Sequence, residues 1–472
     1  MHKTYIGNRG YSIYKDSLSL QEQINIREEL MVKPNISNQF NQNIPSYPVY
    51  KESPKKLYLP RAYGIKNFGN PNEIKISDGL PIDLNFSGTL KEKQEFIVNK
   101  FVAHLQNNFG GLLDIYCGFG KTVLTLKLIS MLKLKTLVIV HKGFLADQWV
   151  ERCEEFLPGV KIGRIQGPII DIEGKDIVIG MLQTLSMHEF PEDQFSDFGF
   201  TVVDECHHMS AEVFVRALEK IVTKYILGLS ATMTRKDGLT KVFKMFMGDI
   251  VHKEVRPQDN IVTIKGVYFT SNDEDFSEVP LDYRGNPMYS SLISKLCKFN
   301  HRSELILRIL KTELENNINQ QILILSHQKN LLNYLFKAIE YRNIASVGYY
   351  IGGMKQQDLK ISENKKIVLA TYQMAAEALD IKSLSSLILA TPKSDIVQAV
   401  GRILRIKHES PLVIDIIDQH EVFRKQWLKR KQFYNKNKYE IITMDNYNSI
   451  INEESEKINK NDFPKGTCLI KI

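Results

Sequence analysis

The sequence predicts an α/β protein with two tandem parallel sheets, each covered by helices, and an additional N-terminal region. Three observations predict this architecture. The chain has 472 residues, which is too long for a single hydrophobic core. Short apolar runs alternate with longer segments of helical period, first over residues 86–252 and again over 293–440. Residues 253–292 are acidic and rich in turn-forming residues, so they are expected to connect the two domains.

The strand-like runs of each domain are short, apolar and followed by helical patterns. In the first domain they read "GLLDIYC", "KTLVIV", "KDIVIG", "FTVVDE" and "YILGLS"; in the second they read "QILILS", "SVGYYI", "KIVLAT", "SLILAT" and "LVIDII". Residues 1–85 are rich in Asn, Pro, Tyr and Lys and show little periodicity, so they are expected to form an accessory region. Residues 441–472 are expected to form a tail. The basic run at 424–438 is expected to be a helix with a solvated face.

Composition excludes several classes of protein. The five cysteines are scattered and lack the pair spacing of a metal cluster or a disulfide framework, which favours a reducing compartment. The sequence contains no apolar run of membrane-spanning length and no signal-peptide core at its start. These features predict a soluble, intracellular protein without a membrane or metal-cluster partner. The formal net charge of +8 is compatible with a polyanionic partner.

The stretch "IYCGFGKTVLTLKL" at 115–128 has the composition of a phosphate-binding loop between a strand and a helix. Gly118 and Gly120 allow backbone N–H groups to turn toward an anion at the helix N-terminus. Lys121 would reach the β- and γ-phosphates of ATP, and the Thr122 hydroxyl would ligate Mg²⁺. The loop pattern calls for Gly at position 115, where this chain has Ile115, so an ordinary strand–turn–helix remains the alternative. The remaining loop positions are Cys117, Phe119 and Val123.

A second acidic motif supports the phosphate-loop interpretation. "FTVVDECHH" at 200–208 puts Asp204 and Glu205 at the end of an apolar strand, where two ionised carboxylates are costly without a function. Asp204 would hold Mg²⁺, and Glu205 would orient and deprotonate the attacking water. The alternative is a helix-capping Asp beside a surface Glu.

Two further motifs fit the same chemistry. "GLSATMTRKDG" places Ser230 and Thr232 at another strand end, where their hydroxyls could bond the carboxylates; a plain polar turn is the alternative. "QAVGRILR" puts Gln398, Arg402 and Arg405 at i, i+4 and i+7, so we expect them on one face of a helix. Two guanidiniums suit a triphosphate held by the other domain, with a basic amphipathic helix as the alternative.

Taken in order, these motifs resemble those of superfamily 2 helicases of the DExH type. The set runs through "LKEKQ", "CGFGKT", "LVIVHKGFLADQW", "IGMLQTLS", "DECH", "SAT", "ILILSHQ", "ATYQMAAEALDI" and "QAVGRILR", over roughly residues 88–420. The resemblance implies two RecA-like domains crossed by nucleic acid, with ATP and Mg²⁺ as cofactors. "CGFGKT", "DECHH" and "SATMTRKDGL" are most similar to the branch with the larger helicase subunit of TFIIH and the poxvirus-type transcript-release helicases of large DNA viruses. Ala378 departs from that branch, where many relatives have Gly.

The resemblance also implies roles for individual residues. Gln94 matches the residue that contacts adenine, Asp380 matches the acidic residue of the coupling motif, and Gln398 would lie near the γ-phosphate. Arg402 and Arg405 match the arginine-finger positions. Residues expected to contact nucleic acid or couple it to hydrolysis are His207, Ser230, Thr232, Gln183, Thr184 and Thr371.

These inferences predict an ATP-dependent DNA helicase or translocase acting on single-stranded or duplex DNA. The resemblance to the poxvirus-type group implies a role in viral transcription, with an RNA polymerase elongation complex as a partner and the host cytoplasm or the virion as its location. Branched-DNA remodelling in recombination and an RNA-directed DExH helicase remain alternatives. A non-enzymatic binding protein is disfavoured because every charged catalytic position is filled.

Overall fold

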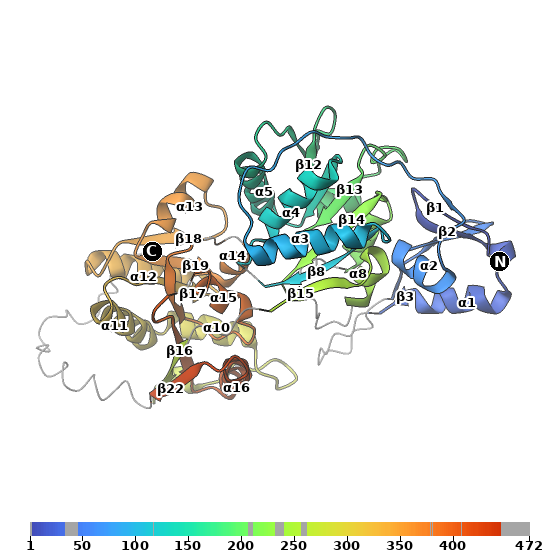
Figure 1. Ribbon diagram of the computed structural model, residues 1–472. Helices are drawn as coiled ribbons and strands as arrows, with labels where there is room; N and C mark the ends of the chain where they lie inside the picture. The colour runs from blue at the N-terminus through green and yellow to red at the C-terminus, as the bar shows by residue number, and fades with distance from the viewer. Residues whose placement is uncertain are drawn as a thin grey trace, which may run out of the picture. The chain divides into compact units, whose positions relative to one another are not determined.

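The computed structural model describes residues 2–33, 46–116, 118–205, 211–231, 240–255, 262–377, 379, 381–406 and 408–444 (Figure 1). The chain divides into two compact units, residues 1–256 and 257–472. The predicted α/β class is confirmed, because each unit contains a mainly parallel sheet whose strands alternate with helices.

The first unit begins with a small module that the sequence pattern left unassigned. Its sheet has the order β5-β6-β2-β1-β7, and β3 pairs with β4 in a separate ribbon. Two helices, α1 (Leu20–Glu29) and α2 (Arg61–Phe68), belong to this module. Its strands are β1 (Thr4–Gly7), β2 (Gly10–Tyr14), β3 (Met31–Val32), β4 (Tyr47–Pro48), β5 (Lys51–Glu52), β6 (Lys56–Leu59) and β7 (Glu73–Ile74).

The large sheet of the first unit has the order β11-β10-β12-β9-β13-β14-β8-β15, and only the β10–β11 pair is antiparallel. Its strands are β8 (Gly110–Ile115), β9 (Thr136–Val140), β10 (Ile162–Gln166), β11 (Ile169–Ile170), β12 (Ile177–Met181), β13 (Phe200–Val203), β14 (Tyr225–Ser230) and β15 (Ile250–Glu254). The central strands are buried on both faces, which explains their continuous apolar sequences.

Helices cover both faces of this sheet. One face packs against α3 (Glu92–Leu105), α4 (Lys121–Leu132) and α5 (Gly143–Phe156), the group in front of the sheet in Figure 1. The other face packs against α6 (Leu182–Met187), α7 (Ala211–Leu218) and α8 (Thr240–Met247). The helices α3, α5, α7 and α8 are amphipathic, so each buries one apolar stripe against the strands.

The sheet of the second unit is parallel throughout, in the order β18-β19-β17-β20-β21-β16-β22. Its strands are β16 (Thr263–Phe269), β17 (Gln321–Ser326), β18 (Val347–Tyr350), β19 (Ile367–Thr371), β20 (Leu384–Leu389), β21 (Leu412–Asp418) and β22 (Glu440–Met444). Its helices are α9 (Glu274–Ser277), α10 (Tyr289–Lys298), α11 (Asn300–Asn316), α12 (Lys329–Tyr341), α13 (Gln356–Glu363), α14 (Tyr372–Glu377), α15 (Val397–Arg402) and α16 (Glu421–Lys436).

Part of the segment expected to connect the domains is a strand of the second sheet. β16 pairs with β21 along its whole length and with β22 on its other side. The acidic, turn-rich sequence that suggested a connector lies after this strand, around α9. The short run "TIKGVYF" carried too little local signal to show that it joins strands about 150 residues later in the chain.

The basic run at 424–438 is helical, but its face is not fully solvated. Within α16, Phe423, Trp427 and Tyr434 are buried, and the Arg430 guanidinium is completely buried against the Asp415 carboxylate. The expected tail contributes β22 up to Met444, and residues 445–472 lie outside the described part of the chain. Among the described residues, none of the helices has the length and apolar character needed to cross a bilayer. No group of three or more potential metal ligands occurs among them either.

Candidate functional site

Several predicted site residues of the first unit gather at one edge of its sheet. The carboxyl ends of parallel strands meet at one edge, where α/β proteins commonly bind ligands. The loop residues Gly118, Phe119, Gly120, Lys121, Thr122 and Val123 follow β8, Gln183 and Thr184 follow β12, Asp204 and Glu205 follow β13, and Ser230 ends β14. Cys117, His207 and Thr232 lie outside the described residues.

The loop after β8 needs its two glycines. Gly118 and Gly120 have φ of 87° and 100°, a region that other residues rarely adopt. A Cβ on Gly120 would also lie 2.5 Å from Gln94 Nε2, so a larger residue would displace the Gln94 side chain. Ile115, the departure from the usual pattern, is the last residue of β8 and is fully buried in the core. The substitution is therefore accommodated within the strand.

Gln94, expected to contact adenine, lies beneath this loop in the first turn of α3. Its Nε2 donates to the Phe119 carbonyl at 2.7 Å, and its Oε1 accepts from the Lys91 N–H at 2.9 Å. The side chain is buried. The Nε2 and Oε1 atoms of Gln94 thus both bond to backbone groups, one in the loop and one at the start of α3. These bonds fix the position of the loop relative to α3.

Lys121 and Glu205 form an ion pair between the start of α4 and the end of β13. Both side chains are largely shielded from solvent, 10% and 19% exposed, which strengthens their attraction relative to a surface pair. Glu205 has φ of 48°, a left-handed conformation that costs free energy for a non-glycine residue. The turn therefore presents the Glu205 carboxylate to Lys121, the first residue of α4.

Asp204 lies beside this pair and is buried. Burial and the neighbouring Glu205 charge raise the pKa of Asp204 to about 6, against the lowering effects of Lys121 and of a hydrogen bond from Trp149. That bond runs from Trp149 Nε1 in α5 to Asp204 Oδ2 at 2.8 Å. Trp149 ends the motif "LVIVHKGFLADQW", but the sequence pattern alone does not assign it a role at the site.

The other residues on this edge differ in exposure. Ser230 is buried and lies opposite Asp114 in the β14–β8 register. The Gln183 side chain is exposed and donates to the His141 carbonyl at 3.3 Å. Thr184 is buried, and its hydroxyl accepts from the Gly167 N–H at 2.9 Å. Gln183 is thus accessible to a ligand on this edge, while Thr184 holds the turn between β10 and β11.

In the second unit the structure corrects the prediction for "QAVGRILR". Gln398 and Arg402 lie in α15, but that helix ends at Arg402, so Arg405 is not on the same helical face. The two guanidiniums still converge, because both donate to the Leu379 carbonyl, Arg402 at 2.9 Å. Arg402 is buried and Gln398 half-buried. Tertiary contacts with the segment after α14, and not helical spacing, bring the arginines together.

Two buried arginines fix the segment that leads into α15. Arg302 forms a bidentate pair with Asp418 and donates to the Ala390 carbonyl at 2.7 Å. Arg430 forms the same kind of pair with Asp415 and donates to the Lys393 carbonyl at 3.0 Å. The signal for this network was present in "LVIDIID", where two carboxylates interrupt an apolar strand.

The remaining predicted residues of this unit are Thr371 and Asp380. Thr371 ends β19, and its hydroxyl accepts from the Met374 N–H at 3.5 Å, at the start of α14. Asp380 lies outside the described residues, as does Ala378.

Each unit matches a model of a known protein family. Residues 87–235 match the family model described as "Type III restriction enzyme, res subunit". Residues 303–407 match "Helicase conserved C-terminal domain". A solved structure with a resembling chain, "The crystal structure of T4 UvsW", covers 94% of this chain and 98% of its own at 19% identity, with a TM-score of 0.38.

Three relatives illustrate the distribution of similar proteins. A protein of African swine fever virus named an ATP-dependent RNA helicase is 26% identical over 74% of this chain and 73% of its own length. A protein of invertebrate iridescent virus 6 named a helicase is 25% identical over 80% of this chain and 88% of its own. A protein of Acanthamoeba polyphaga mimivirus named an ATP-dependent RNA helicase is 35% identical over 93% of this chain and 86% of its own. This chain therefore belongs to the superfamily 2 ATP-dependent helicases of large DNA viruses, and its two large sheets with their helices form RecA-like domains.

Proposed function

We propose that this helicase uses ATP and Mg²⁺ to move along DNA, and that it acts in viral transcription by displacing polymerase or releasing the nascent transcript. ATP hydrolysis is supported by the grouping of Lys121, Glu205 and Asp204 beside a loop that requires two glycines. The choice of DNA is supported by the similarity of "CGFGKT", "DECHH" and "SATMTRKDGL" to the branch with the larger TFIIH helicase subunit.

In the proposed mechanism, Lys121 leaves Glu205 and binds the terminal phosphates of ATP. Glu205 is then available to orient and deprotonate the attacking water. Arg402 and Arg405 exchange the Leu379 carbonyl for the charge that develops on the triphosphate. Gln398 lies on the same short helix as Arg402 and contacts the γ-phosphate or the water.

The donors beside the loop fit a magnesium ion. Thr122 supplies a hydroxyl in the first turn of α4, and Asp204 supplies a buried carboxylate oxygen. Hard oxygen ligands of this kind are those that Mg²⁺ prefers. When bound, the ion supplies positive charge to the β- and γ-phosphates. Trp149 holds the Asp204 carboxylate in place through its indole N–H.

Glu205→Gln should reduce steady-state ATP hydrolysis roughly 10²-fold or more, because loss of a general base typically costs that much. ATP binding should be retained, since glutamine keeps the size of the side chain and removes the charge that competes for Lys121. Single-turnover hydrolysis and equilibrium nucleotide binding measure the two effects separately. Lost binding with a normal single-turnover rate would show that the role is assigned wrongly.

Trp149→Phe should raise the Mg²⁺ concentration needed for half-maximal ATPase activity by about 10- to 100-fold, as expected when a group that orients a metal ligand is lost. Phenylalanine keeps an aromatic ring at this position but lacks the indole N–H that donates to Asp204. Titration of Mg²⁺ at saturating ATP gives the value. An unchanged Mg²⁺ dependence in a variant with normal thermal unfolding would remove Trp149 from this role.

The test of the nucleic-acid substrate is ATPase stimulation by single-stranded DNA, duplex DNA, forked DNA and RNA, compared side by side. We expect DNA to stimulate more than RNA. The second candidate is an RNA-directed helicase, favoured by the names of the mimivirus and African swine fever virus relatives. Stimulation by RNA alone would establish that candidate.

The transcription role is tested with a stalled elongation complex, purified protein and ATP. Release of labelled transcript that depends on Lys121 is the expected result. Brisk ATP-dependent branch migration of a four-way junction, without transcript release, would instead assign the protein to branched-DNA remodelling.

A further inference from the structure

The N-terminal sheet has one face that the helicase motifs do not explain. Its strands alternate, so Ile6, Ile13 and Leu57 point into the module core. The opposite face carries Tyr5, Tyr14 and Lys56, with Tyr14 directly opposite Lys56 in the β2–β6 register. These three side chains are partly exposed, and the flanking Lys3 and Lys75 are exposed. We call this tyrosine- and lysine-lined surface, made of Lys3, Tyr5, Tyr14, Lys56 and Lys75, the tyrosine–lysine face.

The lysines of this face are held over the tyrosine rings. Lys56 Nζ lies 4.6 Å from the centre of the Tyr14 ring and 4.9 Å from that of Tyr5, and it donates to the Tyr5 hydroxyl at 3.1 Å. Lys3 Nζ lies 4.8 Å from the Tyr14 ring, and Lys75 Nζ lies 4.9 Å from the Tyr5 ring. Three ammonium groups thus share two neighbouring rings, which fixes their positions before any ligand arrives.

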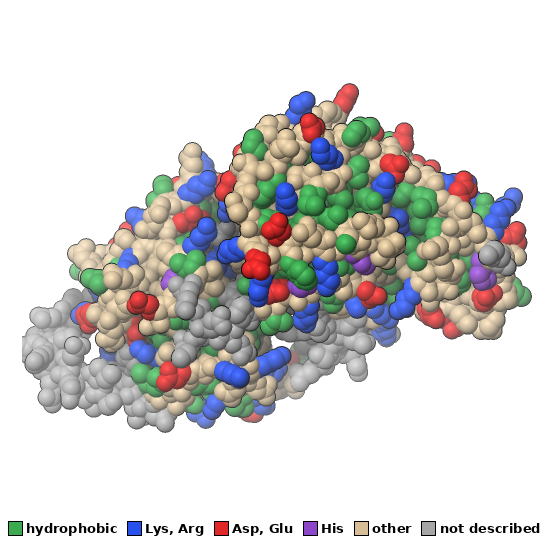
Figure 2. Space-filling model, in the orientation of Figure 1, with side chains coloured by type: hydrophobic (Ala, Val, Ile, Leu, Met, Phe, Trp, Pro, Cys, Tyr) green, Lys and Arg blue, Asp and Glu red, His purple; other side chains and the backbone are tan. Residues whose placement is uncertain are grey.

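The charge of this face is largely unneutralised. Lys75 pairs with Glu73 at 2.9 Å, but neither Lys3 nor Lys56 forms an ion pair with a described residue. The hydrogen bonds to Tyr5 and then Tyr14 raise the pKa of Lys56, so it stays protonated at neutral pH. Basic and acidic side chains are interspersed over the visible face of the first helicase domain (Figure 2). Lys3 and Lys56, which form no ion pair with a described residue, repel one another, and an anionic ligand relieves that repulsion.

The module is fixed to the first helicase domain, so a ligand on it would be coupled to that domain. Arg61 Nη1 donates to the Thr223 and Lys224 carbonyls at 2.9 and 3.1 Å, just before β14. Its guanidinium lies 4.1 Å from the centre of the Phe109 ring, just before β8, and burial lowers the pKa of Arg61 to about 9. Lys51 pairs with Glu219 at 3.2 Å.

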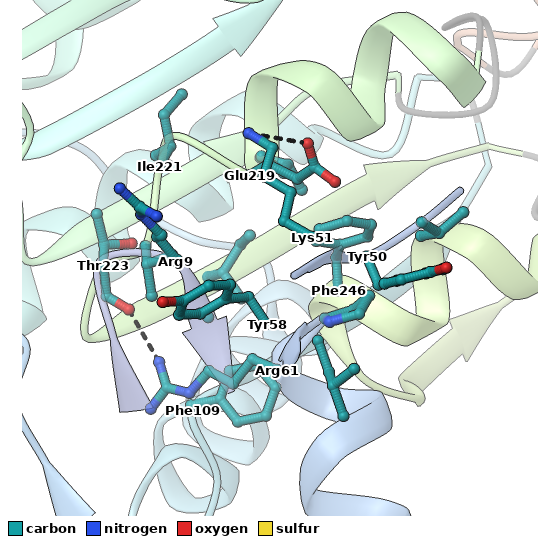
Figure 3. A pocket seen from close by; sticks show the side chains of 17 residues that line it. Arg9, Tyr50, Lys51, Tyr58, Arg61, Phe109, Glu219, Ile221, Thr223 and Phe246 are labelled. Carbon is teal, nitrogen blue, oxygen red and sulfur yellow. Dashed lines mark hydrogen bonds and ion pairs between the residues drawn. The ribbon is translucent and has the colours of Figure 1, made fainter. Parts of the chain in front are cut away.

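Figure 3 shows this junction, in which Arg61 and Phe109 lie together and Lys51 meets Glu219. The cavity left between the module and the domain is about 40 Å³, which holds a few water molecules and excludes a nucleotide. The junction is therefore a structural contact, and the open tyrosine–lysine face is the surface available to a large ligand.

We infer that the tyrosine–lysine face is a second nucleic-acid-binding site, which holds the phosphate backbone of the strand or duplex on which the motor acts. Preorganised cations contact successive phosphates, and the ring edges lie against the sugar–phosphate backbone without reading sequence. The inference rests on the proposed function only in that the ligand is nucleic acid. The tyrosine–lysine face lies outside the helicase motifs and contains none of the proposed ATP-binding residues. Its contact with nucleic acid therefore persists through the ATP cycle.

The test compares two triple variants with the same change in net charge. The first is Lys3→Ala/Lys56→Ala/Lys75→Ala. The matched control is Lys33→Ala/Lys66→Ala/Lys100→Ala, whose side chains are exposed elsewhere in the same unit. Binding of labelled single-stranded and duplex DNA and RNA oligonucleotides is measured without ATP over a range of salt concentrations. Loss of three phosphate contacts should make the slope of log K against log salt shallower by about 2 for a single strand and about 3 for a duplex.

The control variant should keep the wild-type slope, and both variants should keep the basal ATPase activity measured without nucleic acid. Equal slopes in the two triple variants would overturn the inference, whatever nucleic acid is used. Tyr5→Leu/Tyr14→Leu keeps every charge and removes the rings, so it should weaken binding less than the lysine variant. Full affinity in that variant would show that the rings do not position the lysines.

The failure of this inference differs from a failure of the proposed function. If DNA stimulates the ATPase of the lysine variant and the control equally, with equal affinities, only the second site is wrong. If no nucleic acid stimulates the wild-type ATPase, the proposed function fails independently of this face.

Discussion

Lys121→Ala is expected to abolish Mg²⁺-dependent ATP turnover in a protein that remains folded. The variant loses the cation that begins α4 and the ion pair that this cation forms with Glu205. The largely shielded Glu205 carboxylate beside the loop then repels the triphosphate, so both binding and hydrolysis should fall. Phosphate release at saturating ATP, with and without nucleic acid, measures the effect.

The control is Lys127→Ala in the same helix. Lys127 lies 5.5 Å from the centre of the Phe86 ring, so its removal changes the charge of α4 by the same amount away from the loop. It should keep near-normal turnover. Near-normal turnover in a folded Lys121→Ala variant would contradict the phosphate-loop interpretation itself.

Arg402→Ala and Arg405→Ala should each lower kcat by about 10³-fold or more if the residue acts as an arginine finger. The loss should appear mainly in kcat, because the charge that a finger stabilises develops in the transition state. In the structure both guanidiniums donate to the Leu379 carbonyl. In each single variant the remaining arginine therefore still bonds the segment after α14. Steady-state kinetics of the two single variants and the double variant separate their contributions.

Arg402 is buried, so its removal could act through folding. Arg402→Lys keeps a charge and much of the volume but loses the planar fork, and it distinguishes the two effects. A finger role predicts low kcat with a normal unfolding temperature in that variant. Unchanged kcat in both alanine variants would leave "QAVGRILR" as a basic segment without a catalytic role.

Local pattern was sufficient where an element and its functional residues are adjacent in the chain. The strand ending at Ile115, the turn with Gly118 and Gly120, and the helix starting at Lys121 are encoded by consecutive residues. The same holds for Asp204 and Glu205, which stand out because two carboxylates end an apolar strand. In such cases hydrophobic period and glycine placement specify the conformation directly.

Other features depend on contacts between distant parts of the chain. β16 joins the second sheet through pairing with β21, and the N-terminal module forms its sheet from strands of two to five residues. Hydrophobic periodicity alone predicts neither β16 nor the strands of the N-terminal module. Such short runs fit a strand or a loop equally well until the pairing strand is known. The burial of Arg430 in a run that otherwise resembles a solvated helix has the same origin.

The sequence by itself determined the α/β class, the order of the helicase motifs and the charged residues that we propose to act on ATP. Only the tertiary structure decided how those residues are held: Gln94 beneath the loop, Trp149 on Asp204, and Arg402 with Arg405 on one carbonyl after the helix has ended. The physical reason is that a helix or strand follows from local spacing. A hydrogen bond between side chains of different elements depends instead on how those elements pack, which no short stretch of sequence encodes.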